Sequence, residues 1–502
     1  MTSIALRRRT FAAPSRELRL QAAGGLAIAL ATAGLTYFVD RRGVAVGLAA
    51  TLAATTIAWF VLTRHTQLAL ALLMVYVGAI DGYVKLASGV ASVTLLRDVL
   101  LFAIVAGLLV RAQARGTRLH APPLTAWVAG FVVLVLVQIF NPNGGTLVHS
   151  LAGVRQHLEF VPLFFLTFAF VRTTRALRGF VVLLLVVAAA NGIASWVQFN
   201  LKPTQLAAWG PGYADRVLGK GKFAASGRTF SDDAGTSHTR PFGLLGDAGS
   251  GGIMGALALG GVLALVSLAG RRRHLLLAVA LAIGAIAAIV TSQGRGVIVC
   301  SVVVLLAYGL LTATSRGRVR GLLALALVGI VAAIVAQSIV GSAGSGALRY
   351  DGLSATNLVR STASARPGNT TAIVSAMTTY PFGSGLATSG PASGSSGGTD
   401  LTFTLNSESQ FAFMTLETGI AGMLVLVGFT VALFVLGVRR LRHEPDPEAR
   451  ALLAAVIAPI AGILALYYPS QVTATTPTGP YLWAIGGIVA YWLVARPAEL
   501  RR

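Results

Sequence analysis

A small set of arginines and acids stands out from the apolar background of this 502-residue chain. The arginines suited to binding an anion are Arg155, Arg240 and Arg295, and each lies beside the start of an apolar segment. A guanidinium binds a phosphate through two parallel hydrogen bonds, and the free N–H groups at a helix start favour the same ligand. Arginines kept at the mouth of an apolar bundle, where burial costs them solvation, therefore indicate an anionic substrate.

Arg155 follows the turn sequence Asn141-Pro-Asn-Gly-Gly and precedes Glu159 by one helical turn. Residues i and i+4 share one face of a helix, so the two side chains are expected to lie together. One interpretation is an interfacial ion pair at a helix end. The other is an arginine held at the membrane surface to bind a phosphate, with Glu159 in the same substrate site.

Arg295 stands in the short link Thr291-Ser-Gln-Gly-Arg, between two apolar segments. Such a link needs little more than a glycine, so an arginine here suggests an anion site at the start of the next helix. A snorkelling surface arginine is the alternative. Arg240 opens a segment that ends at Asp247, just before another apolar stretch. Both are substrate-site candidates, and the alternative role of Asp247 is to cap the following helix.

Glu408 is the candidate general base, because it precedes an apolar segment and follows a long Gly/Ser-rich stretch. Its alternative is a first-turn acid behind an N-cap at Ser407, favoured by the helix dipole. Glu417 lies deeper in the apolar segment and is expected to be a buried acid bonded to another helix. Arg360 and Arg366 are further substrate-binding candidates, with solvated loop charges as the alternative.

The elements that must position these residues are apolar helices. Hydrophobic residues make up 55% of the chain and charged residues 11%, which is too little polar surface for a soluble protein of this size. The pattern predicts an all-α polytopic transmembrane helix bundle of about 12–14 spans, since roughly 20 apolar residues cross a bilayer. The expected spans are 20–39, 44–63, 67–83, 94–110, 124–140, 158–171, 177–199, 249–268, 275–291, 297–311, 322–340, 411–438, 451–467 and 481–494.

Charge sets the expected orientation. Of the 40 Lys and Arg residues, 25 fall at the termini and in alternate links, and 15 fall on the other side. Nine of those 15 are in two long loops, 200–248 and 341–407, which leaves six in short links. The positive-inside rule then places both termini in the cytoplasm and both long loops outside. The net charge of +23 is interpreted as attraction to anionic lipid headgroups, not to nucleic acid.

The expected organisation has three parts. N-terminal transmembrane helices occupy residues 1–140, and a catalytic core with the loops 200–248 and 341–407 occupies residues 141–425. C-terminal transmembrane helices occupy residues 426–502. The sequence contains no metal-ligand spacing such as His-Glu-x-x-His, and no metal or cofactor is expected.

Several short motifs, taken in order, resemble the O-antigen ligase and O-antigen polymerase superfamily. These are Gly153-Val-Arg155, Arg240-x-x-Gly-x-x-x-Asp247, Thr291-Ser-x-x-Arg295-Gly, Tyr380-Pro-x-Gly-x-Gly385 and Glu408 followed by Glu417-x-Gly-x-x-Gly422. The resemblance covers roughly residues 140–425. Ligases of this family typically carry His-Asn at the place of Glu408-Ser409, so an acid there fits the repeat-unit polymerases better.

The resemblance implies a membrane glycosyltransferase of the C type. Its donor would be a glycan on undecaprenyl diphosphate, used without a metal on the outer face of a bacterial cytoplasmic membrane. The expected activity is an inverting polysaccharide polymerase, with Arg155, Arg295 and Glu408 as catalytic residues. Expected partners are the polyprenyl-diphosphate-linked glycan, membrane lipids, and a chain-length regulator or flippase. The alternatives are ligase-type transfer to a different acceptor and, from another class, a polytopic transporter or lipid flippase.

Overall fold

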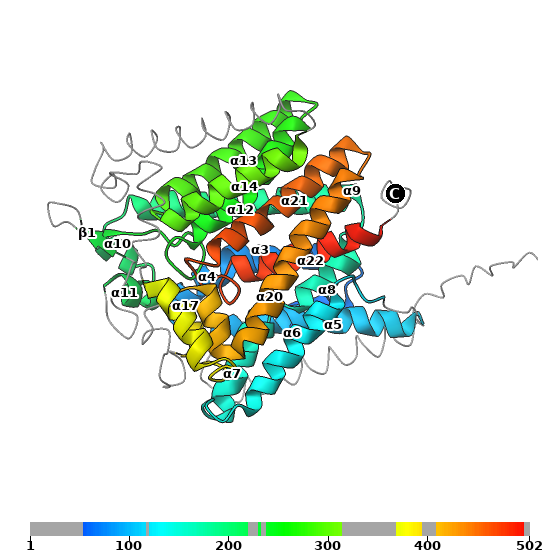
Figure 1. Cartoon of the computed structure of the whole chain (residues 1–502). Helices are drawn as coiled ribbons and strands as arrows, with labels where there is room; N and C mark the ends of the chain where they lie inside the picture. The colour runs from blue at the N-terminus through cyan, green and yellow to red at the C-terminus, as the bar shows by residue number, and fades with distance from the viewer. Residues whose placement is uncertain are drawn as a thin grey trace, which may run out of the picture. The chain divides into compact units, whose positions relative to one another are not determined.

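The computed structural model describes residues 54–116, 120–218, 229–231, 237–313, 368–393 and 408–495 (Figure 1). These residues are largely helical, with one short antiparallel pair of strands, β1 and β2, in the register Thr229 to Thr239. The elements are α3 (Thr66–Val75), η1 (Tyr76–Ile80), α4 (Asp81–Ser88), η2 (Ala91–Thr94), α5 (Leu95–Ala114), α6 (Thr125–Val137), η3 (Gln138–Phe140), α7 (Leu147–Leu158), α8 (Pro162–Phe170), α9 (Thr174–Phe199), α10 (Pro203–Ala207), α11 (Pro211–Val217), β1 (Thr229–Ser231), β2 (Ser237–Thr239), α12 (Ser250–Ser267), α13 (Arg272–Thr291), α14 (Arg295–Thr312), α17 (Gly368–Thr379), α18 (Gly390–Ser393), α20 (Gln410–Arg442), α21 (Pro447–Leu466) and α22 (Thr478–Val494).

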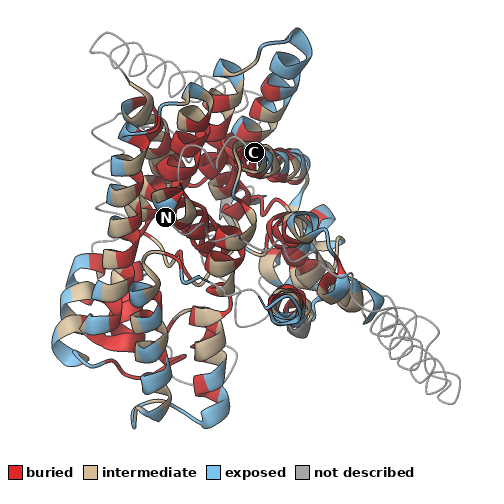
Figure 2. Cartoon of the chain, turned by 90° about the vertical axis from the view of Figure 1, so that its right-hand side faces the viewer, coloured by how far each residue is buried: buried red, intermediate tan, exposed pale blue. Residues whose placement is uncertain are grey.

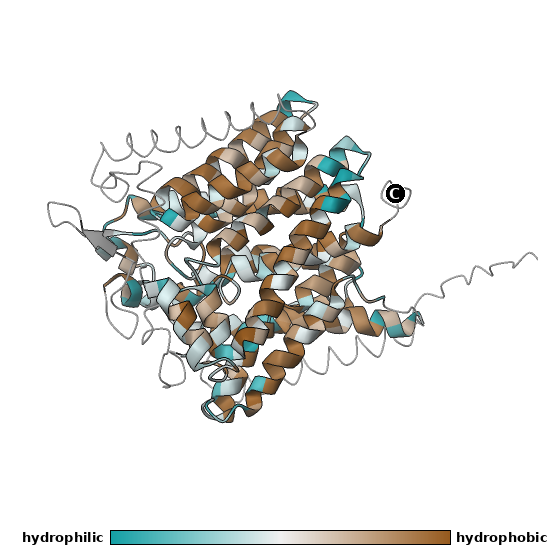
Figure 3. Ribbon diagram, viewed as in Figure 1, coloured by the Kyte–Doolittle hydropathy of each residue, from teal (hydrophilic) through white to brown (hydrophobic). Residues whose placement is uncertain are grey.

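Within the described ranges, seven helical segments are long and apolar enough to cross a membrane, as the hydropathy colours also show (Figure 3). They are Thr66–Ser88, Thr174–Phe199, Ser250–Ser267, Arg272–Thr291, Arg295–Thr312, Gln410–Arg442 and Pro447–Leu466. Each overlaps one expected span, so a polytopic helical membrane bundle is confirmed at this level. The expected spans 124–140 and 481–494 form shorter apolar helices, and 94–110 forms α5. The spans 20–39 and 322–340 and the first half of 44–63 lie outside the described residues.

The expected span 158–171 is wrong as a single span. The chain here forms two helices, α7 and α8, separated by a turn at residues 159–161. Pro162 begins α8 because proline has no N–H to donate and is tolerated only in the first turn of a helix. Its nine residues are too few to cross a bilayer. The interruption leaves Glu159 at the C-terminal end of α7.

The chain divides into two units, one of Met1–Ala69 with Asp98–His120 and the other of Leu70–Arg97 with Ala121–Arg502. In the smaller unit, Arg111 lies on α5 and donates hydrogen bonds to the backbone oxygens of Val61 (2.8 Å) and Thr63 (3.0 Å). These bonds satisfy carbonyls at the end of the helical stretch 54–62.

The larger unit is built around tightly packed helices rich in small residues. α9 packs against α12 and α13, and α21 packs against α12 and α14. Gly192 on α9 lies so close to the backbone of Gly284 on α13 that a Cβ atom would overlap it. Small residues allow this approach and give close van der Waals packing in a membrane bundle. Buried residues accordingly lie along the facing sides of these helices, while the outward faces are exposed (Figure 2).

One end of the larger unit, here called the basic end, gathers several charged helix termini. Arg178 at the start of α9 forms an ion pair of 2.7 Å with Glu448 at the start of α21. Arg440 at the end of α20 donates to the backbone oxygen of Trp492 at the end of α22 (2.7 Å). The link between α12 and α13 also lies at this end, where hydrophilic residues cluster (Figures 1 and 3). The expectation that these basic segments share one side fits this arrangement.

The opposite end, here called the loop end, carries the starts of α12, α14 and α20 and the end of α21. The backbone N–H of Gln410 donates to the carbonyl of Tyr467 (2.8 Å), which joins the start of α20 to the end of α21. A Cβ atom on Gly296 would lie 3.4 Å from the side chain of Leu466, so the start of α14 lies there too.

A small hydrophobic cluster fixes the first long loop to the loop end. It consists of Leu86, Leu206, Tyr213, Val217 and Phe242, all buried. Tyr213 packs edge-on against Phe242 at 5.7 Å, and burial raises the pKa of its phenol above the usual value. The cluster ties α10 and α11 to the segment that carries Arg240.

Candidate functional site

Four charged side chains form a continuous chain of ion pairs at the loop end. Arg155 lies 3.6 Å from Glu159, which lies 2.8 Å from Arg97, which in turn lies 2.8 Å from Asp81. Arg97 is buried between its two carboxylates, whereas the side chain of Arg155 is 38% exposed. Arg155 also donates to the hydroxyl of Thr94 (3.0 Å). The expected ion pair between Arg155 and Glu159 is therefore present, and Arg155 is the member of the chain most open to a ligand.

Arg97 explains how Glu159 can be buried at a helix end. Its guanidinium donates to one carboxylate from α4 and to one from the α7–α8 turn, each at 2.8 Å, and stacks over the ring of Phe160, 4.9 Å from the ring centre. An arginine suits this position because its planar fork bonds two carboxylates while its face contacts an aromatic ring. Arg97 therefore holds Glu159 in place next to Arg155.

The Arg240 guanidinium lies at the starts of two helices, one of which begins with Arg295. A Cβ atom on Gly249, the N-cap of α12, would lie 3.2 Å from Nη2 of Arg240, and one on Gly294, the N-cap of α14, would lie 3.5 Å from the same atom. Arg295 is the first residue of α14, so its backbone lies where the free N–H groups of that helix begin. Its Nε atom is buried and has no acceptor among the described residues. The Arg240 guanidinium, two helix starts and the backbone of a second arginine lie together here, which favours an anion.

Asp247 does not cap α12, contrary to that alternative. Gly249 occupies the N-cap position with φ of 83°, and no side chain caps the helix. Asp247 instead contributes its backbone oxygen to the N–H of Ser250 (3.2 Å) and pairs its carboxylate with Arg216 of α11 (3.2 Å). The glycine adopts a left-handed conformation that lets the chain turn into α12 at Ser250, one residue after the expected start of that span.

α4 lies between these two groups of charges. Lys85 on α4 is close enough to Asp81, Arg97, Arg216 and Asp247 to interact electrostatically with each of them. The N–H of Tyr83 also donates to the carbonyl of Leu244 (3.0 Å), within the segment that starts at Arg240. The ion-pair chain, through Asp81, and the segment that starts at Arg240, through Leu244, therefore both contact the short helix α4.

Glu408 lies just outside α20, not in its first turn. Ser409 is the N-cap, because its hydroxyl accepts from the N–H of Phe411 (3.2 Å), so the predicted cap at Ser407 is wrong. The hydroxyl of Ser409 also donates to the carbonyl of Tyr467 (3.2 Å), and this tertiary contact fixes where the helix begins. Glu408 is exposed. The start of α20 beside it and the start of α14 at Arg295 both lie against the end of α21.

Glu417 is fully buried and forms the centre of a second polar group. It lies 2.6 Å from Nε2 of His157, and Oε1 accepts from the N–H of Ser389 (3.0 Å). Gln156 donates to the same carboxylate (3.3 Å) and accepts from the N–H of Ala392 (2.7 Å). The prediction of a buried acid bonded to another helix is confirmed.

α20 is broken next to this acid. Gly419 has φ of 74°, and a Cβ atom there would lie 2.7 Å from the carbonyl oxygen of Pro381. The backbone groups freed by the break bond to the Tyr380-Pro-x-Gly loop: the N–H of Ile420 donates to Pro381 (2.9 Å), and the N–H of Ser384 donates to Leu416 (2.6 Å). The loop of this motif therefore satisfies the backbone hydrogen bonds that the helix break beside Glu417 leaves open.

The motif glycines converge on the same region. A Cβ atom on Gly153 would lie 2.6 Å from the side chain of Leu386, and one on Gly385 would lie 2.6 Å from Gly144. Three of the motifs therefore meet around Glu417. The remaining two, which contain Arg240 and Arg295, meet at the starts of α12 and α14.

Not every expected site residue is placed. Arg360 and Arg366 lie outside the described residues. The structure pairs Arg155 with Glu159 and places Arg240 beside the N-cap of the helix that Arg295 begins. That Arg155, Arg240 and Arg295 reach one diphosphate stays a prediction. Sequence reasoning missed His157, Gln156 and Ser389 as partners of Glu417. The available signal was that Gln156 and His157 directly follow the motif arginine Arg155.

Among the described residues, no group of three or more His, Cys, Asp or Glu side chains is arranged to hold a metal ion. Arginines, Lys85 and helix starts are positive groups in this part of the molecule. They could bind an anionic group directly.

No protein-family model, curated protein or solved structure matches this chain. The fold of the described residues defines the class as a polytopic helical membrane bundle.

Proposed function

We propose that the chain is a membrane glycosyltransferase of the C type that polymerises glycan repeat units carried on undecaprenyl diphosphate. The observation that supports it most is the position of the Arg240 guanidinium at the N-cap glycines of α12 and α14, the second of which directly precedes Arg295. In this proposal, the loop end faces outside a bacterial cytoplasmic membrane, and both termini face the cytoplasm. The motif order that resembles the O-antigen ligase and polymerase superfamily supports the same reading.

The proposed reaction needs charge stabilisation more than acid catalysis. The acceptor hydroxyl attacks the anomeric carbon, the bond from that carbon to the diphosphate oxygen breaks, and the diphosphate leaves with the electron pair. Direct attack inverts the anomeric centre. Arg240, Arg295 and the N–H groups of α14 bind the diphosphate as its charge grows. Each hydrogen bond to a charged group contributes about 1.5–3 kcal/mol, so a few of them supply several kcal/mol.

Glu408 is the proposed general base. It takes the proton from the acceptor hydroxyl, a contribution of about 10²–10⁴-fold in rate. Its exposed position at the start of α20, beside the end of α21 and the start of α14, suits an acceptor that arrives from the outer face. Arg155, supported by Glu159 and Arg97, is proposed to bind a second phosphate or the donor sugar.

Purified protein in proteoliposomes, given a lipid-linked repeat unit, tests the proposal. A ladder of longer lipid-linked chains is expected from the wild type and not from Arg295→Gln. Arg272→Gln, an exposed arginine at the basic end, is the matched control and should give the normal ladder. Absence of any ladder from the folded wild type, or an equal ladder from Arg295→Gln, contradicts the proposal. A single transfer to an added non-identical acceptor would instead support the ligase alternative.

A transporter or lipid flippase is the second candidate, and one observation favours it. Three buried acids lie at helix interruptions: Asp81 after the π-helix η1, Glu159 between α7 and α8, and Glu417 beside the break at Gly419. Broken helices with charges are typical of transport sites. The same proteoliposomes separate the two functions, because a flippase moves a fluorescent polyprenyl-diphosphate sugar between leaflets without extending it.

A further inference from the structure

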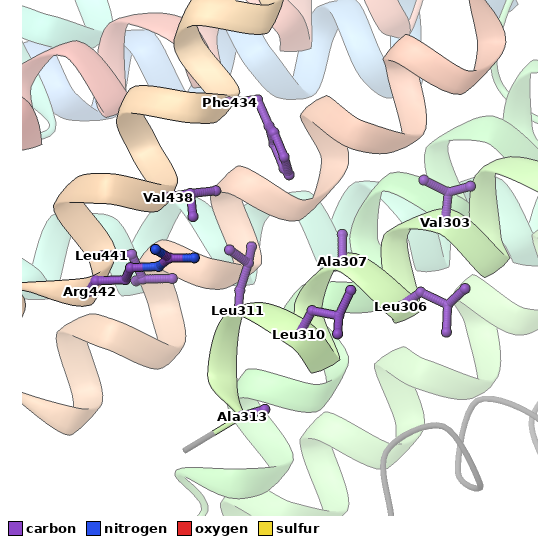
Figure 4. Close-up of a pocket in the computed structure, with 10 residues that line it drawn as sticks. All are labelled: Val303, Leu306, Ala307, Leu310, Leu311, Ala313, Phe434, Val438, Leu441 and Arg442. Carbon is purple, nitrogen blue, oxygen red and sulfur yellow. The ribbon is translucent and has the colours of Figure 1, made fainter. Parts of the chain in front are cut away.

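A cavity of about 500 Å³ lies between α14 and α20, away from the candidate site (Figure 4). Leu306 and Leu310 line it from α14, and Phe434 and Val438 line it from α20. Of the residues that line it, Arg442 is the one with a charge. The volume falls within the roughly 300–1,000 Å³ of small-molecule sites.

The shape of this groove suits a single lipid chain. Its lining runs from Val303 to Leu311 on α14 and from Phe434 to Arg442 on α20, which is about 12 Å of helix at 1.5 Å per residue. One leaflet of a bilayer core is about 15 Å deep, half of the roughly 30 Å total. Leu310 is 62% exposed, so the groove opens on the outward face of the bundle. An acyl chain could therefore enter from the side.

Arg442 stands at the end of the groove near the basic end. The nearby Arg440 already has protein partners, because it pairs with Glu444 (2.9 Å) and donates to the backbone oxygen of Trp492 (2.7 Å). Arg442 is exposed, and in the described part of the chain it forms no ion pair. A cation above an apolar groove at a helix end matches a phosphate above an acyl chain.

We propose that this groove binds an anionic phospholipid, with one acyl chain between α14 and α20 and the phosphate on Arg442. The groove lies toward the basic end, whereas Arg240 and Arg295 lie at the loop end. The lipid site is therefore distinct from a donor site at Arg240 and Arg295. The proposal requires that the chain is a membrane bundle, and it does not depend on the proposed glycosyltransferase activity. Because the groove joins two helices, the lipid stabilises their packing at this end.

Native mass spectrometry of the purified full-length chain tests this site. The protein is exchanged into an equimolar mixture of phosphatidylglycerol and phosphatidylcholine, and retained lipids are counted. The wild type should retain one phosphatidylglycerol preferentially. Arg442→Gln should lower that retention about tenfold, as expected for loss of one charge-assisted hydrogen bond. Leu310→Trp should fill the groove and reduce retention of both lipids.

Two matched variants control for general effects. Ile283→Trp changes an apolar residue of similar exposure on α13, 64% against 62% for Leu310, and Arg272→Gln removes another exposed arginine at the basic end. Both should retain phosphatidylglycerol as the wild type does. A thermal shift gives a second readout, because added phosphatidylglycerol should raise the melting temperature of the wild type and not of Arg442→Gln. Equal retention by Arg442→Gln and wild type, or no lipid retained by the wild type, overturns the proposal.

Discussion

Arg97→Met removes the cation that two buried carboxylates share. Arg97 donates to Asp81 and to Glu159, each at 2.8 Å, and the side chains of these acids are only 4% and 9% exposed. Removing one partner of a buried pair leaves uncompensated charge and typically costs about 3–5 kcal/mol. We therefore expect the free energy of unfolding in mild detergent to fall by about that amount. Tryptophan fluorescence during chemical denaturation measures this free energy.

Two further variants test whether charge is the cause. The triple variant Arg97→Met, Asp81→Asn, Glu159→Gln removes all three charges together and should recover most of the lost stability. Arg155→Gln should cost less than about 1 kcal/mol, because Arg155 is 38% exposed and water screens its pairing with Glu159. An unfolding free energy for Arg97→Met within about 1 kcal/mol of wild type would refute the reasoning, as would a triple variant less stable than the single one.

The remaining predictions concern geometry, strain and orientation. Arg240→Lys and Arg295→Lys should each lower polymer yield at least about tenfold at unchanged melting temperature, because a point charge cannot replace the planar fork; yields within twofold of wild type would argue against diphosphate binding. Gly419→Ala should cost about 1–3 kcal/mol of unfolding free energy, since the residue has φ of 74° and its Cβ would meet Pro381 at 2.7 Å. Gly130→Ala, where a Cβ meets nothing within 4 Å, is the control, and equal stability of the two variants would contradict the strain. An impermeant thiol reagent on intact cells should label Phe382→Cys at the loop end and not His443→Cys at the basic end. The native Cys300 is buried and should give little background labelling. Labelling of His443→Cys without labelling of Phe382→Cys would contradict the proposed topology.

The sequence predicted the spans well where apolar residues run without interruption. α9, α12, α13 and α14 lie within a few residues of their expected bounds because hydrocarbon length sets helix length. The span 158–171 was wrong because proline and a buried acid interrupt the apolar run. Composition records how apolar a segment is, but not where its backbone hydrogen bonds are broken.

Helix starts and long-range partners were harder to predict. Ser409 rather than Ser407 caps α20 because its hydroxyl also bonds Tyr467, a contact between residues 58 positions apart. His157 meets Glu417 across 260 positions, and no local spacing reveals such a pair. The pairing of Arg155 with Glu159 was predictable, because it depends only on the period of one helix.

Chain growth by Glu408→Gln is the most direct test of the central proposal. The amide matches the carboxylate in shape but cannot take a proton from the acceptor hydroxyl. The variant should fold and bind the lipid-linked donor yet give no ladder, and Glu408→Asp should retain partial activity at most. Glu448→Gln, an acid paired with Arg178 at the basic end, is the control and should polymerise normally. A near-normal ladder from Glu408→Gln at matched protein level would contradict the account, and Asp247 would then be the next base to test.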